Sequence, residues 1–123
     1  MEALSIVLNG TPLHRPGPLL QLEHLEGRTG LRLSGEIDVS NVGEFAAALQ
    51  FTFRPTRDFH LDLAGLSYMD TTAVGLMAGT AATSTDGRRF VLWSPPPIVR
   101  TTLQVFGWDE LPALYVVEGW VTR

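Results

Sequence analysis

Apolar and polar residues alternate along two consecutive stretches near the start of the chain, Leu19 to Glu26 and Leu31 to Ile37. A period of two is typical of a strand that buries one face and exposes the other. The two stretches are separated by Gly27 to Gly30, a short segment whose two glycines suit a turn. We therefore predict two antiparallel strands joined by a short loop.

Helical periodicity follows this hairpin and alternates with further strands. Apolar residues three or four positions apart predict a helix over about 41–51, capped by Ser40, and two later helices that begin at Asp70 and after Ser94. Gly107 is well placed to end the last helix. The inner faces of the two later helices are expected to consist of Val74, Met77, Ala78 and Ala81, and of Ile98, Val99, Thr102, Leu103 and Phe106.

Three more strands complete the pattern, at Phe59 to Leu63, Phe90 to Trp93 and Ala113 to Val117. The order is then ββαβαβαβ. Because strands that alternate with helices imply crossover connections, we predict an α/β fold with a mixed β-sheet and helices packed on it. One domain is expected over residues 19–123. Residues 1–18, with several helix and strand breakers between Pro12 and Pro18, are expected to be an N-terminal extension or linker.

The charge of the chain argues against nucleic acid as a partner. The net charge is −4, and all nine basic residues are arginines scattered along the chain, whereas binding to phosphate backbones needs clustered cations. The chain has no cysteine, and no stretch of it resembles a signal peptide or a membrane span. We expect a cytoplasmic protein with no direct membrane insertion.

The sequence offers little for catalysis. It contains none of the common phosphate-loop, dinucleotide, nucleophile-elbow or zinc-helix motifs. His14, His24 and His60 are widely spaced and are assigned to packing or to the surface instead of a shared metal site. No pair of carboxylates has a spacing that demands acid and base roles. We expect no enzyme, no cofactor and no metal.

One junction carries chemistry of interest, the segment Asp70-Thr71-Thr72-Ala73-Val74-Gly75, where a predicted strand meets the second helix. The backbone N–H groups of a first helical turn have no partners within the helix. An Asp or Thr there can accept one of these hydrogen bonds, worth about 1 kcal/mol. Such a cap needs no function, so the local pattern leaves a structural cap and a functional site both open.

This junction lies in the second of three blocks, Leu33 to Asn41, His60 to Leu76 and Phe90 to Trp108. Together and in this order, the blocks resemble the STAS domain family of bacterial anti-sigma factor antagonists. The resemblance covers about residues 19–118 and implies that Thr71, with Thr72 as the fallback, is phosphorylated by an anti-sigma factor kinase. It implies that the unphosphorylated form binds this kinase and frees a sigma factor, and that a phosphatase restores that form. Ala73 stands where the family usually has glycine, and serine is the commoner acceptor.

The expected partner surface surrounds Thr71, because ligands of such sheets gather at strand ends near helix N-termini. Its members are expected to be Glu36, Asp38, Ser40, Asn41, Asp70, Thr72, Ala73 and Val74. The alternative for Ser40 is a helix cap only, and for Asp38 a solvated loop. Trp108 and Trp120 flank acidic residues; buried packing is the simpler assignment for both, and contact with a partner is the alternative.

Two other functions stay open. An STAS-like adaptor without phosphorylation, serving as a subunit of a transport or sensory complex, would use the same helix. A sensory domain that binds a nucleotide has little support, because the chain lacks lysine and a glycine-rich phosphate loop. Many family members carry a helix after the last strand, for which residues 118–123 are too short, so the chain also fits a part of a larger multidomain regulator.

Overall fold

Five strands of the described part of the chain form one sheet, and the predicted order of strands and helices over it is confirmed. The structure is a computed structural model that describes residues 7–8, 11–12 and 19–119. The strands of this sheet are β3 (Leu20–His24), β4 (Gly30–Ile37), β5 (Phe59–Met69), β6 (Phe90–Trp93) and β7 (Leu114–Val117). The helices are α1 (Val42–Thr52), α2 (Thr71–Ala81), α3 (Pro97–Val105) and the short 3-10 helix η1 (Trp108–Glu110).

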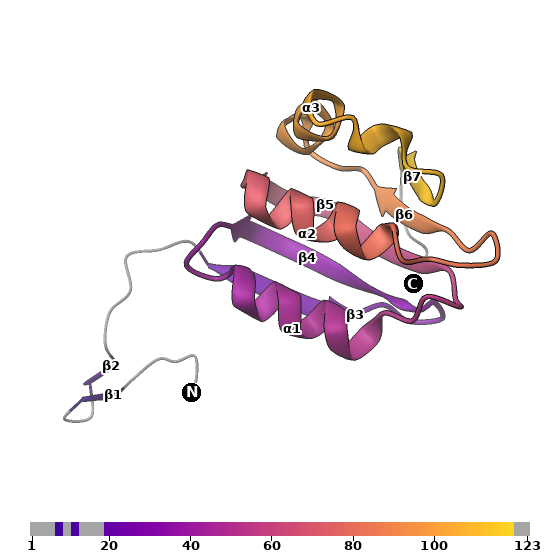
Figure 1. Cartoon of the computed structure of the whole chain (residues 1–123). Helices are drawn as coiled ribbons and strands as arrows, with labels where there is room; N and C mark the ends of the chain where they lie inside the picture. Colours follow the sequence, from indigo (N-terminus) through magenta and orange to yellow (C-terminus); the bar gives the residue numbers. More distant parts are fainter. Residues whose placement is uncertain (1–6, 9–10, 13–18, 120–123) are drawn as a thin grey trace.

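The sheet is mixed, as predicted. Its strand order is β3-β4-β5-β6-β7; β3 pairs with β4 antiparallel, and each later neighbour pairs in parallel. Because right-handed crossovers that always step in the same direction place their helices on the same face, the three helices belong to one layer. Figure 1 shows α1 and α2 lying along this face, and α2 contacts both α1 and α3.

The hydrophobic core lies between this helical layer and the sheet. α2 contributes the buried residues Ala73, Val74, Met77, Ala78 and Ala81, which confirms the predicted stripe. The rings of Phe59 and Phe90 pack against each other on neighbouring strands, with centroids 5.3 Å apart, and Phe53 after α1 packs on both. The core therefore fixes α2 on the strand that precedes it.

The inner face of α3 is shorter than predicted. Val99, Thr102 and Leu103 are buried, whereas Ile98 and Phe106 are exposed, so the prediction for these two residues is wrong. The reason for Phe106 is that α3 ends at Val105, and Phe106 itself leaves the helical path with φ −94° and ψ 1°. Gly107 ends the helix in the left-handed conformation, as expected, with φ 72°.

The N-terminal segment contains β1 (Val7–Leu8) and β2 (Thr11–Pro12), which pair antiparallel with each other. The boundary at residue 18 between extension and domain stays a prediction. His14 and Trp120 lie outside the described residues. Among the helices of the described part, none has the length and apolar character needed to cross a membrane.

Candidate functional site

Asp70 joins the end of β5 to the start of α2. Its backbone N–H donates to the carbonyl oxygen of Ile37 at 3.0 Å, which holds this end of β5 to the end of β4. Its side chain accepts a hydrogen bond from the backbone N–H of Ala73 at 3.0 Å. Asp70 is therefore the N-cap of α2, and the cap that the sequence left open belongs to Asp70 and not to either threonine.

Thr71 and Thr72 are the first two residues of α2, and both are exposed. Within the described part of the chain, the hydroxyl of Thr71 forms no hydrogen bond, and the cap of α2 is supplied by Asp70. The backbone N–H groups of a first turn concentrate partial positive charge at this point. The arrangement thus presents a hydroxyl to solvent at the end of the helix that favours an added negative charge.

Ala73 and Val74 require a correction. Both were expected in the partner surface, but both are fully buried members of the core. A helix that starts at Thr71 and packs on the sheet must turn its third and fourth residues inward. Their side chains hold α2 in place, and they are not available to a partner.

A polar loop between β4 and α1 lies beside this helix start. The Asp38 carboxylate accepts from the backbone N–H and the hydroxyl of Ser40, at 2.8 and 2.6 Å. The buried Asn41 side chain accepts from the Asp38 N–H and donates to the Glu36 carbonyl, both at 3.0 Å. The N-cap position of α1 is Asn41, so the prediction that Ser40 caps this helix is wrong.

The structure brings this loop and the start of α2 together at one edge of the sheet, because Ile37 and Met69 are register partners. Glu36 is exposed and pairs in register with Tyr68. Two exposed apolar residues here, Val39 and Tyr68, were not among the predicted site residues. Val39 had a signal in the sequence, since an apolar residue within a polar loop fits neither the strand nor the helix periodicity.

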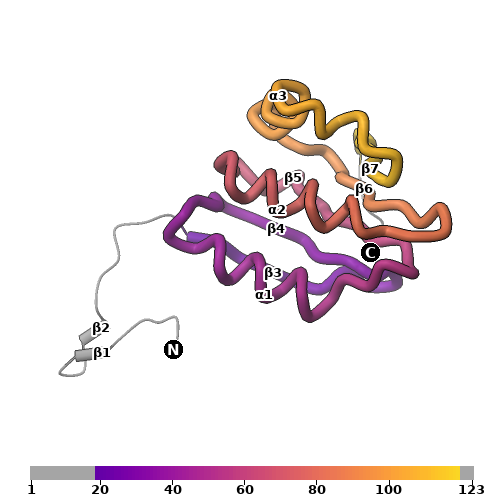
Figure 2. The backbone as a smooth tube through the Cα atoms, in the orientation of Figure 1, coloured from indigo at the N-terminus to yellow at the C-terminus, as the bar shows by residue number. Residues whose placement is uncertain are grey.

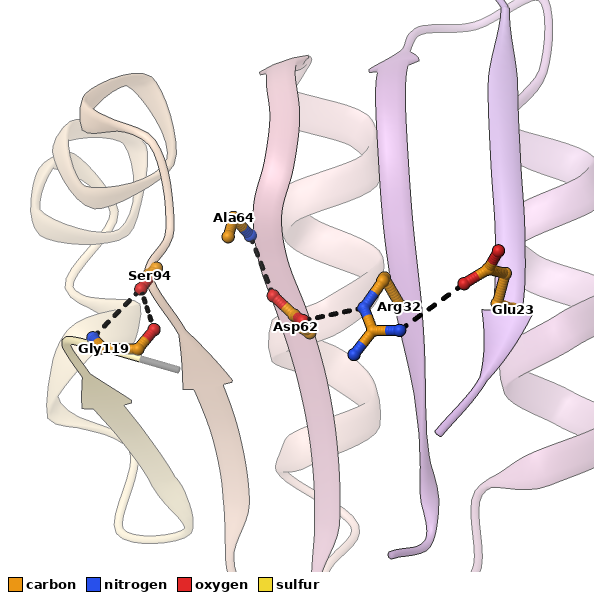
Figure 3. A network of polar contacts seen from close by, with 6 residues as sticks. All are labelled: Glu23, Arg32, Asp62, Ala64, Ser94 and Gly119. Carbon is orange, nitrogen blue, oxygen red and sulfur yellow. Dashed lines mark hydrogen bonds and ion pairs between the residues drawn. The ribbon is translucent and has the colours of Figure 1, made fainter. Parts of the chain in front are cut away.

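The opposite face of the sheet carries a separate polar network (Figure 3). Arg32 Nε lies 2.9 Å from Asp62 Oδ2, and Arg32 Nη1 lies 3.5 Å from Glu23 Oε1. Asp62 also accepts from the backbone N–H of Ala64 at 3.0 Å. The hydrogen bond with Asp62 is the main cause that raises the pKa of Arg32 above its ordinary value. This network ties β3, β4 and β5 together and is far from Thr71 along the strands.

His60 lies on the same face and is tied to β6. Trp93 Nε1 donates to His60 Nδ1 at 3.0 Å, and the Arg28 guanidinium lies 5.4 Å from the centre of the Trp93 ring. Burial, assisted by the charge of Arg28, lowers the pKa of His60 below its usual value. His60 is thus a neutral acceptor in a structural contact. Among the described residues, no group of three or more His, Asp or Glu side chains is placed to hold a metal ion.

The comparison with protein families defines the class of this protein. A family model described as the Mlab STAS domain matches residues 20–117. The chain belongs to the STAS domain family. The anti-sigma-B factor antagonist of Staphylococcus epidermidis is 41% identical over 51 residues, a stretch that makes up 41% of this chain and 47% of that relative. The chain therefore spans about half the length of the curated relatives that it matches.

Solved structures share the fold. An anti-sigma factor antagonist from Mycobacterium paratuberculosis superimposes with a TM-score of 0.62 at 20% identity, over 84% of this chain and 90% of that one. The unphosphorylated form of the anti-sigma factor antagonist SpoIIAA gives 0.56 at 24% identity, over 83% and 89%. An anti-sigma-factor antagonist domain protein from Planctomyces limnophilus gives 0.58 at 18% identity, over 80% and 89%.

Proposed function

We propose that this chain is an anti-sigma factor antagonist switched by phosphorylation of Thr71. The unphosphorylated chain binds an anti-sigma factor kinase and so frees a sigma factor. The phosphorylated chain is released, and a phosphatase returns it to the binding form. The observation that carries the proposal is the exposed Thr71 hydroxyl at the first position of α2, next to a cap that Asp70 provides without it. The names of the curated relatives agree with this role.

The modification is a phosphoryl transfer to Thr71 Oγ1. The bond between the γ-phosphorus of ATP and the β–γ bridging oxygen breaks as the bond from the γ-phosphorus to Thr71 Oγ1 forms. The hydroxyl proton passes to a base of the kinase, and ADP leaves. The acceptor side chain is exposed, so the kinase reaches it without unfolding α2.

The added phosphate acts on the partner and not on the fold. It carries a charge of about −1.5 to −2, and a helix N-terminus stabilises an anion by about 0.3 to 1 kcal/mol. A partner carboxylate at about 4 Å would instead be repelled by about 1 to 4 kcal/mol. This repulsion corresponds to a loss of affinity of about five- to 700-fold, and the upper part of this range is enough for release.

The test is phosphorylation of the purified chain by its cognate kinase with ATP, followed by intact mass spectrometry. We expect the wild type to gain one phosphoryl group, Thr71→Ser and Thr72→Ala to gain it as well, and Thr71→Ala to gain none. A Thr71→Ala chain that is still modified, together with an unmodified Thr72→Ala chain, would assign the acceptor to Thr72. If no variant is modified, the phosphorylation switch is wrong.

The second candidate is an adaptor that binds through α2 without modification. The observation that favours it is the absence of any charged residue in α2, since an uncharged helix face suits a permanent contact. As part of a transport or sensory complex, the chain would then copurify with a membrane ATPase complex. Native protein that copurifies in this way and carries no phosphothreonine would support the adaptor over the switch.

A further inference from the structure

An aromatic pair lies on the surface where α3 ends. The rings of Phe106 and Trp108 are stacked, with centroids 4.6 Å apart and an angle of 16° between the planes. Gly107 separates the two residues and makes the turn between α3 and η1. Phe106 is 52% exposed, and its neighbour Val105 is also exposed. Phe106 therefore offers the outer face of the stack to solvent, whereas Trp108 is half-buried and packs against the core. The sequence had predicted Phe106 to be buried.

This pair is continuous with the helix that carries the proposed phosphorylation site. The Trp108 ring lies against Gly75, since a Cβ on Gly75 would come to 3.2 Å from Trp108 Cη2. Gly75 and Thr71 are four positions apart, so they share one side of α2 and are separated by about 6 Å along its axis. α3 and the segment after it lie beside α2 in Figure 2. Trp108 therefore contacts α2 about one helical turn from Thr71, on the same side of the helix.

The charges around the pair favour a cation. Asp109 and Glu110 follow Trp108 directly, and both are exposed. α2 contains no charged residue, and Arg100, the basic residue of α3, forms an ion pair with Glu118. An aromatic face bordered by carboxylates is a favourable place for a guanidinium group, which stacks on rings and pairs with carboxylates at the same time.

We infer that the Phe106–Trp108 pair is a second contact point for the anti-sigma factor kinase and receives an arginine side chain of that protein. The inference rests on the proposed function, because it takes the partner from it. Aromatic residues are enriched in interfaces, and a few such residues carry most of the affinity. Removal of such a residue weakens binding by about 30-fold or more.

The test measures the affinity of the unphosphorylated chain for the kinase that modifies Thr71, by isothermal titration calorimetry. We expect Phe106→Ala to weaken binding by about 30-fold. Phe51→Ala is the matched control: Phe51 is 77% exposed on α1, and its replacement should leave the affinity within about twofold. Asp109→Asn combined with Glu110→Gln should weaken binding several-fold and reduce its dependence on salt.

The outcomes separate this inference from the proposed function. A wild-type chain that does not bind the kinase refutes both. If the wild type binds, Thr71→Glu abolishes binding and Phe106→Ala has no more effect than Phe51→Ala, the switch stands and the aromatic contact is wrong. If Phe106→Ala instead abolishes self-association of the free chain in light scattering and leaves kinase affinity unchanged, the pair contacts a second copy, which also overturns the inference.

Discussion

Removal of the Asp62 carboxylate should destabilise the domain strongly, because it would leave the Arg32 guanidinium without its main partner. The Asp62 side chain is 3% exposed and that of Arg32 is 19% exposed. Breaking a buried ion pair by deleting one partner costs about 3 to 5 kcal/mol. Arg32 keeps some contact with water and with Glu23, 3.5 Å away, so we expect the lower end, about 3 kcal/mol, for Asp62→Leu.

The measurement is urea unfolding followed by far-ultraviolet circular dichroism. With a slope near 1.5 kcal/mol per molar urea, Asp62→Leu should lower the midpoint by about 2 M. The double variant Arg32→Met with Asp62→Leu removes both charges and should cost only about 1 kcal/mol, since apolar groups often replace a buried pair at little cost. The effects of the two substitutions on the free energy of unfolding should therefore be far from additive.

The exposed ion pair of Arg89 with Asp58 provides the control. Arg89 Nη2 and Asp58 Oδ2 are 3.4 Å apart, and the two side chains are 51% and 32% exposed. Arg89→Met should therefore lower the free energy of unfolding by less than about 1 kcal/mol. If Asp62→Leu costs no more than Arg89→Met, the Arg32–Asp62 pair does not act as a buried pair.

Variants at four further positions test other parts of the structure by urea unfolding. Burial lowers the pKa of His60 below its ordinary value of 6.5. Between the folded pKa and about 6.5, the unfolded chain therefore binds more protons than the folded chain, and the free energy of unfolding should fall as the pH drops through this range. His60→Gln should remove this decline. Gly43→Ala in α1, where a Cβ meets nothing within 4 Å, should stabilise by about 0.5 to 1 kcal/mol. Gly30→Ala would overlap the carbonyl oxygen of His60 and should prevent normal pairing of β4 with β5. Asp70→Ala should cost about 1 kcal/mol through loss of the cap, whereas Asp70→Asn should cost much less.

Most of the fold follows from the periodicity of the sequence, because nearly every element buries one face in a single core. β5 is an exception, because it is longer than its periodicity predicts. Alternation stops near Ala64 and Gly65, yet the strand continues to Met69 because its parallel pairing with β4 continues through two irregularities in register. Pairing of residues distant in sequence maintains this part of the strand, and the local pattern does not contain that information.

For the candidate site, the strand–helix junction was predictable from the sequence, and its hydrogen bonds were less so. The sequence places Asp70 at the junction of a strand and a helix, and the structure brings the loop after β4 to the same edge. Whether Ser40 or Asn41 occupies the N-cap position of α1 depends on hydrogen bonds inside the loop, where the Asn41 side chain is held by Asp38 and Glu36, and residue types alone do not determine them. Phe106 is exposed because α3 ends at Val105, one residue before it, and side-chain periodicity does not show at which residue a helix ends.

Asp70 caps α2, whereas Thr71 is exposed, and this difference determines what the proposed switch can change. Asp70 holds the first turn of α2 through the Ala73 N–H, so a phosphate on Thr71 replaces no contact that the fold uses. The Phe106–Trp108 pair lies against Gly75, on the same side of α2 as Thr71. If it contacts the partner as inferred, the phosphorylated chain retains that part of the affinity. Release then requires the repulsion at Thr71 to exceed what the aromatic contact alone contributes, and Phe106→Ala should make the phosphorylated chain dissociate more completely.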